Sequence, residues 1–245
     1  MDTCLLVGNG LNRTLRASIS WGDLLADIAN KYGVDYHSEI PMPMEFERIV
    51  NSYLSHNSHP SADVYTEFKS KIAEKICTTK LPRDAIHHEL LNANPDAILT
   101  TNYDYFLEYA FNESYVHKGS NVKKYLFDAT SIQRDVTFYH LHGMVSNPQS
   151  ICLGYEHYAG IVQKLRAELN TKEKGLADGM AIKKVLFGEK KRDNSWGERF
   201  YTSNIAIIGL GLSSCEIDLW WLITHRAYLY YSDYCGLKEG IYEKN

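Results

Sequence analysis

The arrangement of apolar residues constrains the fold more than any other feature of this sequence. Four short apolar runs do not alternate with polar residues; they cover residues 3–8, 95–101, 136–141 and 203–208. Continuous apolar runs of this length are typical of strands that are buried on both faces of a sheet. Helical patterns separate the runs, at 21–32, 44–54, 62–76, 83–92, from about 103, 156–169 and 216–230. Strands that alternate with helices predict an α/β fold, a Rossmann-like parallel sheet with helices on both faces.

The helices between the first and second strands predict a further feature. Ser20 can cap the helix at 21–32, and Gly33 can end it. The helical block at about 34–94 then separates the first strand–helix unit from the second strand. We therefore expect a helical insertion that caps a single domain spanning residues 1–245.

Composition narrows the class of protein. Hydrophobic residues make up 44% of the chain and charged residues 23%, as in ordinary folded domains. The net charge of −4 shows no basic bias, so direct binding of nucleic acid is not expected. No apolar run reaches the roughly 18 residues of a membrane span, and the start MDTCLLVGNG is not a signal peptide. These features predict a cytoplasmic protein that does not bind a membrane.

The cysteines do not indicate a metal site. Their number is odd and no two have C-x-x-C spacing; they are Cys4, Cys77, Cys152, Cys215 and Cys235. This pattern suggests neither a disulfide framework nor a zinc ribbon. We therefore expect no bound metal.

Polar or glycine-rich motifs follow all four strands, at the edge where open α/β sheets bind ligands. The first motif, Gly8-Asn9-Gly10-Leu11-Asn12, lacks the third glycine of a dehydrogenase fingerprint. Its glycines would let the backbone approach a phosphate, with amide groups pointing at it. A simple tight turn is an equally good interpretation of this motif alone.

The second motif, Thr100-Thr101-Asn102-Tyr103-Asp104, places hydroxyl, amide and carboxylate groups where a helix is expected to begin. Capping of that helix by Thr101 or Asn102 is favoured on the local pattern. The functional alternative is a set of hydrogen-bonding groups that face a ribose and an amide.

The third and fourth motifs complete the set. In His140-Leu141-His142-Gly143, His142 is better placed for acid–base work because a glycine follows it, although a structural role is open for both histidines. The two could also form a metal pair, but no third ligand cluster is visible. In Gly209-Leu210-Gly211-Leu212-Ser213, the glycines repeat the first motif, and Ser213 or Ser214 can cap the last helix.

Taken in order, these four motifs resemble the sirtuin-like family. The resemblance is strongest to a bacterial branch with a Ser-Trp-x-x-Leu-Leu motif, present here at residues 20–25, and with the late segment at residues 216–221. It runs from about residue 3 to residue 230. It implies catalytic roles for Asn102, beside the ribose or a water, and for His142 as general base. It implies NAD contacts at Gly8, Asn9, Gly10, Leu11, Asn12, Thr101, Asp104, Gly209, Gly211, Leu212 and Ser213, with Asp104 at the carboxamide end.

The resemblance also implies a function. Deacylating sirtuins carry four zinc-binding cysteines after the His-Gly pair, whereas residues 144–158 hold only Cys152. This departure argues against a deacylase and favours the branch that cleaves NAD to nicotinamide and ADP-ribose as an effector of antiphage defence. Such a glycohydrolase is expected to act as a homo-oligomer or with a sensor or activator protein. Two alternatives stay open: a non-catalytic module that senses NAD or ADP-ribose for a partner, and an ADP-ribosyl transferase or deacylase.

Aromatic residues crowd the last helix and the segment after it: Trp220, Trp221, Tyr228, Tyr230, Tyr231 and Tyr234. One helix cannot turn all of them inward. We expect some to be exposed or buried between subunits, with a helix packed inside the monomer as an equal alternative.

Overall fold

A computed structural model of the chain describes residues 2–15, 18–58, 63–79, 85–116, 127–169 and 195–232. Its centre is a five-stranded sheet in the order β3-β4-β2-β1-β5. The strands are β1 (Thr3–Val7), β2 (Ala97–Thr100), β3 (Ser131–Gln133), β4 (Val136–His140) and β5 (Asn204–Ile208). β1, β2, β4 and β5 run parallel, which confirms the Rossmann-like α/β expectation.

Two details of the sheet differ from the expectation. β3 is an unpredicted edge strand that pairs antiparallel with β4, so the sheet is mixed. β5 forms the opposite edge, and its Ala206 and Ile207 are exposed, unlike the buried residues of β1 and β2. The apolar run at 203–208 therefore forms a strand without the two-sided burial that the pattern suggested.

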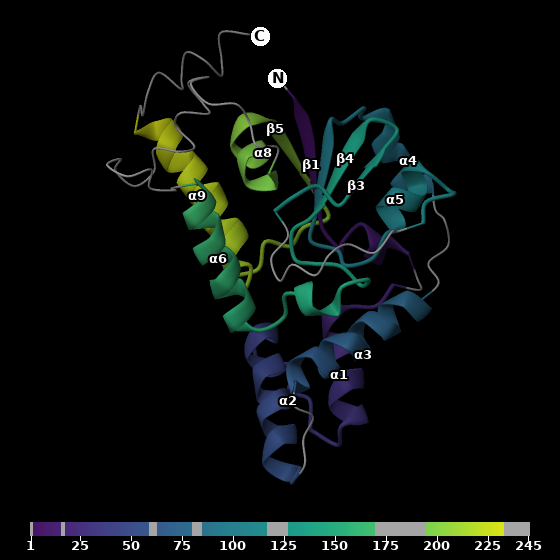
Figure 1. Cartoon of the computed structure of the whole chain (residues 1–245), viewed down its shortest axis with the longest axis vertical. Helices are drawn as coiled ribbons and strands as arrows, with labels where there is room; N and C mark the ends of the chain where they lie inside the picture. The colour runs from purple at the N-terminus through teal and green to yellow at the C-terminus, as the bar shows by residue number, and fades with distance from the viewer. Residues whose placement is uncertain are drawn as a thin grey trace.

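Helices cover both faces of the sheet, as expected (Figure 1). On one face, α6 (Tyr155–Leu169), α8 (Trp196–Thr202) and α9 (Ile217–Tyr231) share a core with side chains of β1, β2 and β4. On the other face, α4 (Ala85–Asn92) and α5 (Phe106–Phe111) pack on Leu5, Ile98 and Phe138. α8 was not predicted, because the sequence around it reads as a charged run.

Three helices lie beyond the carboxyl ends of the parallel strands (Figure 1). They are α1 (Trp21–Lys31), α2 (Met42–His56) and α3 (Val64–Thr78), and they share one apolar cluster with the loops that follow β2 and β4. We call these three helices the cap. α4, which the sequence grouped with the insertion, packs on the sheet through Leu90 instead. The cap thus includes α1 and excludes α4.

Local signals set the ends of the first helix as expected. The Ser20 hydroxyl accepts from the backbone N–H of Asp23, and the Asp23 carboxylate accepts from the backbone N–H of Ser20. This reciprocal capping box satisfies two N–H groups at the start of α1. Gly33 follows the last turn with a φ of +67°, a conformation that glycine adopts without steric cost.

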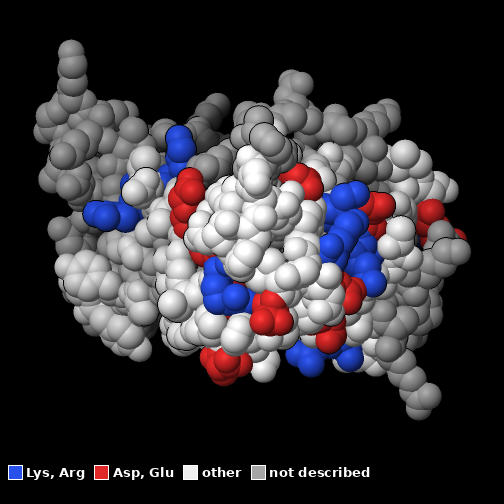
Figure 2. Space-filling model, turned by 90° about the horizontal axis from the view of Figure 1, so that it is seen from below, with Lys and Arg blue, Asp and Glu red and all other residues white. Residues whose placement is uncertain are grey.

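The surface of the cap is mixed in charge. Figure 2 shows this end of the molecule, where Lys and Arg side chains lie among Asp and Glu side chains across the described part of the face. In the described ranges, no helix combines the length and apolar character that crossing a bilayer requires. Cys4, Cys77, Cys152 and Cys215 are free thiols.

The aromatic residues of α9 divide between core and solvent. Trp220, Tyr228 and Tyr231 are 42%, 60% and 75% exposed. Trp221 is half-buried and stacks on His225 at a centroid distance of 4.9 Å. The expectation that some of these side chains face outward is confirmed for the described residues, and Tyr234 lies outside them.

Candidate active site

The turns after β1, β2, β4 and β5 converge on one cleft of about 650 Å³ between the sheet edge and the cap. This size is typical of ligand-binding pockets. We call it the large cleft. Its walls include predicted residues from all four motifs: Asn9, Gly10, Thr101, His142, Gly209, Gly211 and Ser213. The cap contributes Trp21, Leu25 and Met42.

A second hollow, which we call the small pocket, measures about 40 Å³. It holds four of the predicted residues: Asn9, Asn12, Asn102 and Asp104. Asn9, Trp21 and Tyr103 line both hollows, so the two adjoin there. The rings of Trp21 and Tyr103 meet edge to face at 4.6 Å. Of the remaining predicted residues, Gly8, Leu11 and Leu212 line neither hollow.

The two glycine turns pack against each other. A Cβ on Gly8 or Gly10 would lie 2.6 or 2.5 Å from the Gly209 carbonyl oxygen. The amide of Gly8 donates to Ile208 and that of Gly10 to Gly209, at 2.9 and 2.7 Å. These amides are therefore engaged within the protein and do not point at a phosphate, contrary to the expectation. The glycines are needed here for close backbone approach between the turns.

His142 follows β4 and faces a carboxylate that the sequence reading did not single out. Its Nε2 donates to Oδ2 of Asp218 on α9 at 2.8 Å, and both side chains are buried. The bond fixes the tautomer, so Nδ1 is the nitrogen left to accept a proton. Burial alone would favour the neutral ring, but the Asp218 carboxylate outweighs it and raises the pKa of His142.

The turn after His142 requires its glycine. Gly143 has a φ of +93°, and a Cβ there would lie 2.2 Å from the Ser150 carbonyl oxygen. The chain then returns so that the Cys152 amide donates to the His142 carbonyl at 2.8 Å. This tight return holds the His142 backbone against the sheet edge.

Asn102 is anchored through its backbone and open through its side chain. Only 3% of the residue is exposed, and neither its Oδ1 nor its Nδ2 has a hydrogen-bond partner within the described structure. An unpaired buried amide is costly, so such a group is a candidate for ligand binding. Neither Thr101 nor Asn102 caps α5, which begins at Phe106, so the capping interpretation was wrong.

Asp104 and Asn12 join the first two motifs. Asn12 Nδ2 donates to Asp104 Oδ2 at 3.0 Å, and His87 on α4 donates to Asn12 Oδ1 at 2.8 Å. Asp104 Oδ1 accepts from the Phe106 amide. Burial raises the pKa of Asp104 from 3.8 to about 6. The small pocket thus has a carboxylate held by an amide, and His87 is a partner that the local pattern did not reveal.

The loop after β5 uses a carboxylate where the sequence suggested a serine cap. α9 has Glu216 at its N-cap position with no side-chain capping bond, so the expected cap by Ser213 or Ser214 is wrong. Instead, Oε2 of Glu216 accepts from the Ser213 amide at 2.9 Å. Burial raises the pKa of Glu216, which lines the large cleft beside His142.

Two residues of the large cleft and its surroundings were not predicted from the sequence. Arg13 lies one turn beyond the first glycines and lines the cleft, and it is the cationic side chain among its described lining residues. Asp218 lies 76 positions from its partner His142. Only its place in the segment at 216–221 marked it. No group of three or more potential metal ligands occurs among the residues that the structure describes.

The profile of the SIR2-like domain matches residues 96–218 of this chain, half of its length. The chain belongs to the SIR2-like family. The matched part of the SIR2-like domain contains Asn102, His142 and Asp218, while the first glycine turn precedes it. The family expectation drawn from the motifs is therefore confirmed.

The SIR2-like chain is also similar to a curated protein, the NAD(+) hydrolase ThsA of Bacillus cereus (strain MSX-D12). The two are 24% identical over 189 residues, which is 76% of this chain and 36% of ThsA. This SIR2-like chain therefore spans about a third of that relative's length.

Proposed function

We propose that this protein is an NAD glycohydrolase that cleaves NAD to nicotinamide and ADP-ribose. The observation that carries the proposal is the His142–Asp218 pair at the large cleft. A buried histidine paired with a carboxylate is the arrangement that a general base needs, whereas a pure binding module does not need one. Similarity to an NAD(+) hydrolase supports the same choice.

The reaction requires the protein mainly to position the substrate, the water and the base. The bond between C1′ of the ribose and the nicotinamide nitrogen breaks, and its electron pair neutralises the cationic ring, so no general acid is required. A water oxygen bonds to C1′, and Nδ1 of His142 takes the water proton. Asn102 would hold the ribose or the water, and the developing oxocarbenium charge would lie in a site that excludes bulk water.

The rest of the substrate has a place along the two hollows. The nicotinamide would lie where the two hollows adjoin, with its carboxamide toward Asp104 in the small pocket, and the large cleft would take the ADP end. Arg13 would neutralise the pyrophosphate, since the Gly8 and Gly10 amides are already engaged. The loop with Gly209, Gly211 and Ser213 would line the adenosine side.

In the cell, we propose that the enzyme is a cytoplasmic effector of a bacterial antiphage defence system. It would act as a homo-oligomer or with a sensor or activator protein. The exposed aromatic side chains of α9 support assembly, because aromatic residues are enriched at protein interfaces.

The test is nicotinamide release from NAD, followed by chromatography for the parent protein and two variants. His142→Ala is expected to lower turnover by about 10²–10⁴-fold, the usual cost of losing a general base. Asn102→Ala is expected to lower it by about 10²-fold, because the ribose or the water is no longer held in place. Each variant's thermal melt is recorded beside its rate, so that loss of folded protein is not counted as loss of chemistry. Arg226→Lys is the control, because Arg226 binds carbonyls of the α8 segment away from both hollows.

The results decide between enzyme and sensor. Near-parental turnover by His142→Ala would remove that residue from the mechanism. A parent protein that binds NAD but releases no nicotinamide in any assembly state would favour the alternative, a sensing module for NAD or ADP-ribose. Release of nicotinamide only with a protein acceptor would indicate a transferase.

A further inference from the structure

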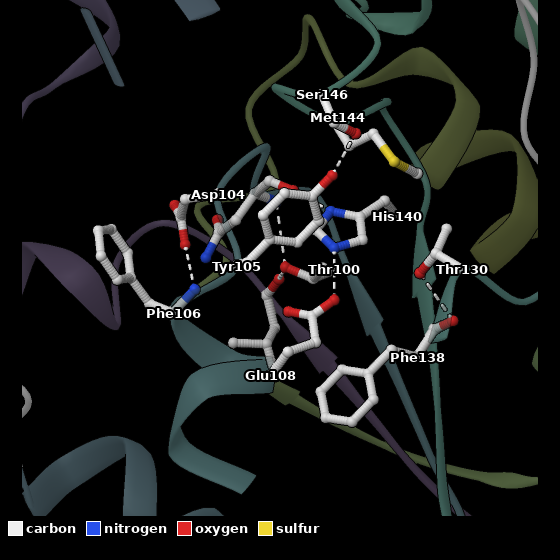
Figure 3. Close-up of polar contacts among 12 residues, drawn as sticks. Thr100, Asp104, Tyr105, Phe106, Glu108, Thr130, Phe138, His140, Met144 and Ser146 are labelled. Carbon is white, nitrogen blue, oxygen red and sulfur yellow. Dashed lines mark hydrogen bonds and ion pairs between the residues drawn. The ribbon is translucent and has the colours of Figure 1, made fainter. Parts of the chain in front are cut away.

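His140 lies two residues before His142 but belongs to a different environment. It is 1% exposed and lines neither hollow. Its Nδ1 bonds the backbone carbonyl of Asn102 at 2.7 Å, and its Nε2 bonds Oε1 of Glu108 on α5 at 2.9 Å. Figure 3 shows the ring between Glu108 and the segment after β2, with Tyr105 beside it.

Both partners of the ring are acceptors, which determines where its protons are. A carbonyl oxygen can only accept, so Nδ1 must carry a hydrogen. Opposite an ionised Glu108, Nε2 must carry one as well, and the pair is then a buried imidazolium–carboxylate pair. Burial would lower the pKa of His140, but Glu108 and the Asn102 carbonyl outweigh it and raise the pKa above the ordinary value.

The His140–Glu108 pair bonds the backbone of Asn102, the residue whose side-chain amide has no hydrogen-bond partner within the described structure. The peptide group after Asn102 is held by His140, and the amide before it donates to Thr100 Oγ1 at 3.0 Å. Thr100 Oγ1 in turn donates to the Val7 carbonyl at 2.9 Å. Both peptide planes that flank the Asn102 Cα are thus fixed, which fixes the direction in which its carboxamide leaves the backbone.

We propose that His140, oriented by Glu108, is a positioning residue that fixes the Asn102 peptide so that its carboxamide is held in the small pocket. The inference rests on the proposed role of Asn102 and extends it to two residues that touch no substrate. Stability alone does not explain the pair, because a buried ion pair is often no more stabilising than apolar residues of similar volume. The precise placement of Asn102 does explain the pair, since catalytic groups need rigid support.

The experiment compares two substitutions at one position. His140→Ala removes the donor to Asn102, whereas His140→Asn places an amide nitrogen where Nδ1 lies and keeps that donor. Glu45→Ala is the matched control: Glu45 is equally buried, pairs with Arg48 at 2.7 Å within the cap, and lines neither hollow. Melting temperature, kcat and KM for NAD are measured for each folded protein.

A positioning role predicts that kcat falls while KM changes little, a pattern that a merely structural role would not give. His140→Ala should lower kcat per folded molecule by about 10²-fold, the cost of a misplacement near 1 Å, with KM changed much less. His140→Asn should recover most of that loss. Glu45→Ala should lower the melting temperature while keeping the parental kcat. Parental kcat in His140→Ala, or equal losses in the Ala and Asn variants, would overturn the proposal.

A second readout needs no activity and separates this inference from the proposed function. Nitrogen-15 NMR of labelled histidine should show both ring nitrogens of His140 protonated near pH 7. In Glu108→Gln, which should fold because the amide can donate to Nε2, only Nδ1 should stay protonated. A neutral ring with hydrogen on Nε2 alone would refute the positioning role even if NAD is cleaved. The expected signature in a protein that cleaves no NAD would refute the glycohydrolase alone.

Discussion

At the scale of single residues, His140 and His142 show how position in the fold separates two similar side chains. Both meet a carboxylate, but Glu108 is 32 positions from its histidine and Asp218 is 76 positions away. The sequence could place the two histidines at the end of a strand and favour His142 from the glycine after it. It could not supply the carboxylates, because no local pattern encodes a contact between a strand end and a distant helix.

The pH dependence of turnover should report the His142–Asp218 pair. A general base acts when unprotonated, so kcat/KM should rise with pH through the raised pKa of His142. Asp218→Asn removes the charge that raises this pKa, and the rising limb should then shift to lower pH. Steady-state rates between pH 5 and 9 measure the shift, and an unmoved limb would mean that another group controls it.

The same pair affects stability with a defined sign. The pKa of His142 is raised in the folded protein. The stabilisation that comes from its pairing with Asp218 is therefore fully present below pH 6.5, the ordinary pKa of histidine. This contribution is lost as pH rises through the raised folded pKa. The free energies of unfolding of the parent protein and of Asp218→Asn, measured by urea titration, should therefore differ more at pH 6 than at pH 9.

At the scale of elements, the strands and most helices could be predicted because their signals are local. The parallel strands end within a few residues of the expected positions, and the capping box at Ser20 fixes the start of α1. β3 was missed because its hairpin turn uses Arg134 and Asp135, both with positive φ, where Asn-Gly is the usual signal. α8 was missed although Ser195 accepts from the Glu198 amide, since the charged residues before it hid that signal.

The packing of the two glycine turns makes a prediction about stability. Gly10→Ala would place a methyl group 2.5 Å from the Gly209 carbonyl oxygen, and overpacking of this kind costs about 1–3 kcal/mol. Gly211 is the matched control, because a Cβ there meets no atom within 4 Å of it in the described structure. Gly211→Ala should change the free energy of unfolding by less than about 0.5 kcal/mol. Equal losses in urea unfolding would contradict the packing argument.

At the scale of the whole molecule, the site lies where the cap meets the sheet. Its general location could be predicted, because the carboxyl ends of parallel strands share one edge. Its division into a large cleft and a small pocket could not, since Trp21 of the cap and Tyr103 of the sheet meet only in the folded chain. The same holds for the network of Asn12, Asp104 and His87, which joins three separate segments.

The position of Trp21 gives the protein a built-in optical probe. Its indole borders both hollows, whereas Trp196 is fully buried and Trp220 and Trp221 lie on α9. Adding NAD or ADP-ribose should therefore change the tryptophan emission, because a ligand there alters the polarity around the Trp21 indole. Trp220 is the second reporter, since its indole nitrogen donates to the Leu212 and Ser213 carbonyls in the loop that borders the large cleft. Trp21→Phe should keep the fold and remove the part of the ligand-dependent signal that arises where the two hollows adjoin, and Trp220→Phe in the same background should remove the part from the Ser213 side. An undiminished signal in the double variant would place the bound nucleotide away from both hollows. With a signal that depends on these two residues, a stopped-flow trace of the parent protein would time the filling of the site.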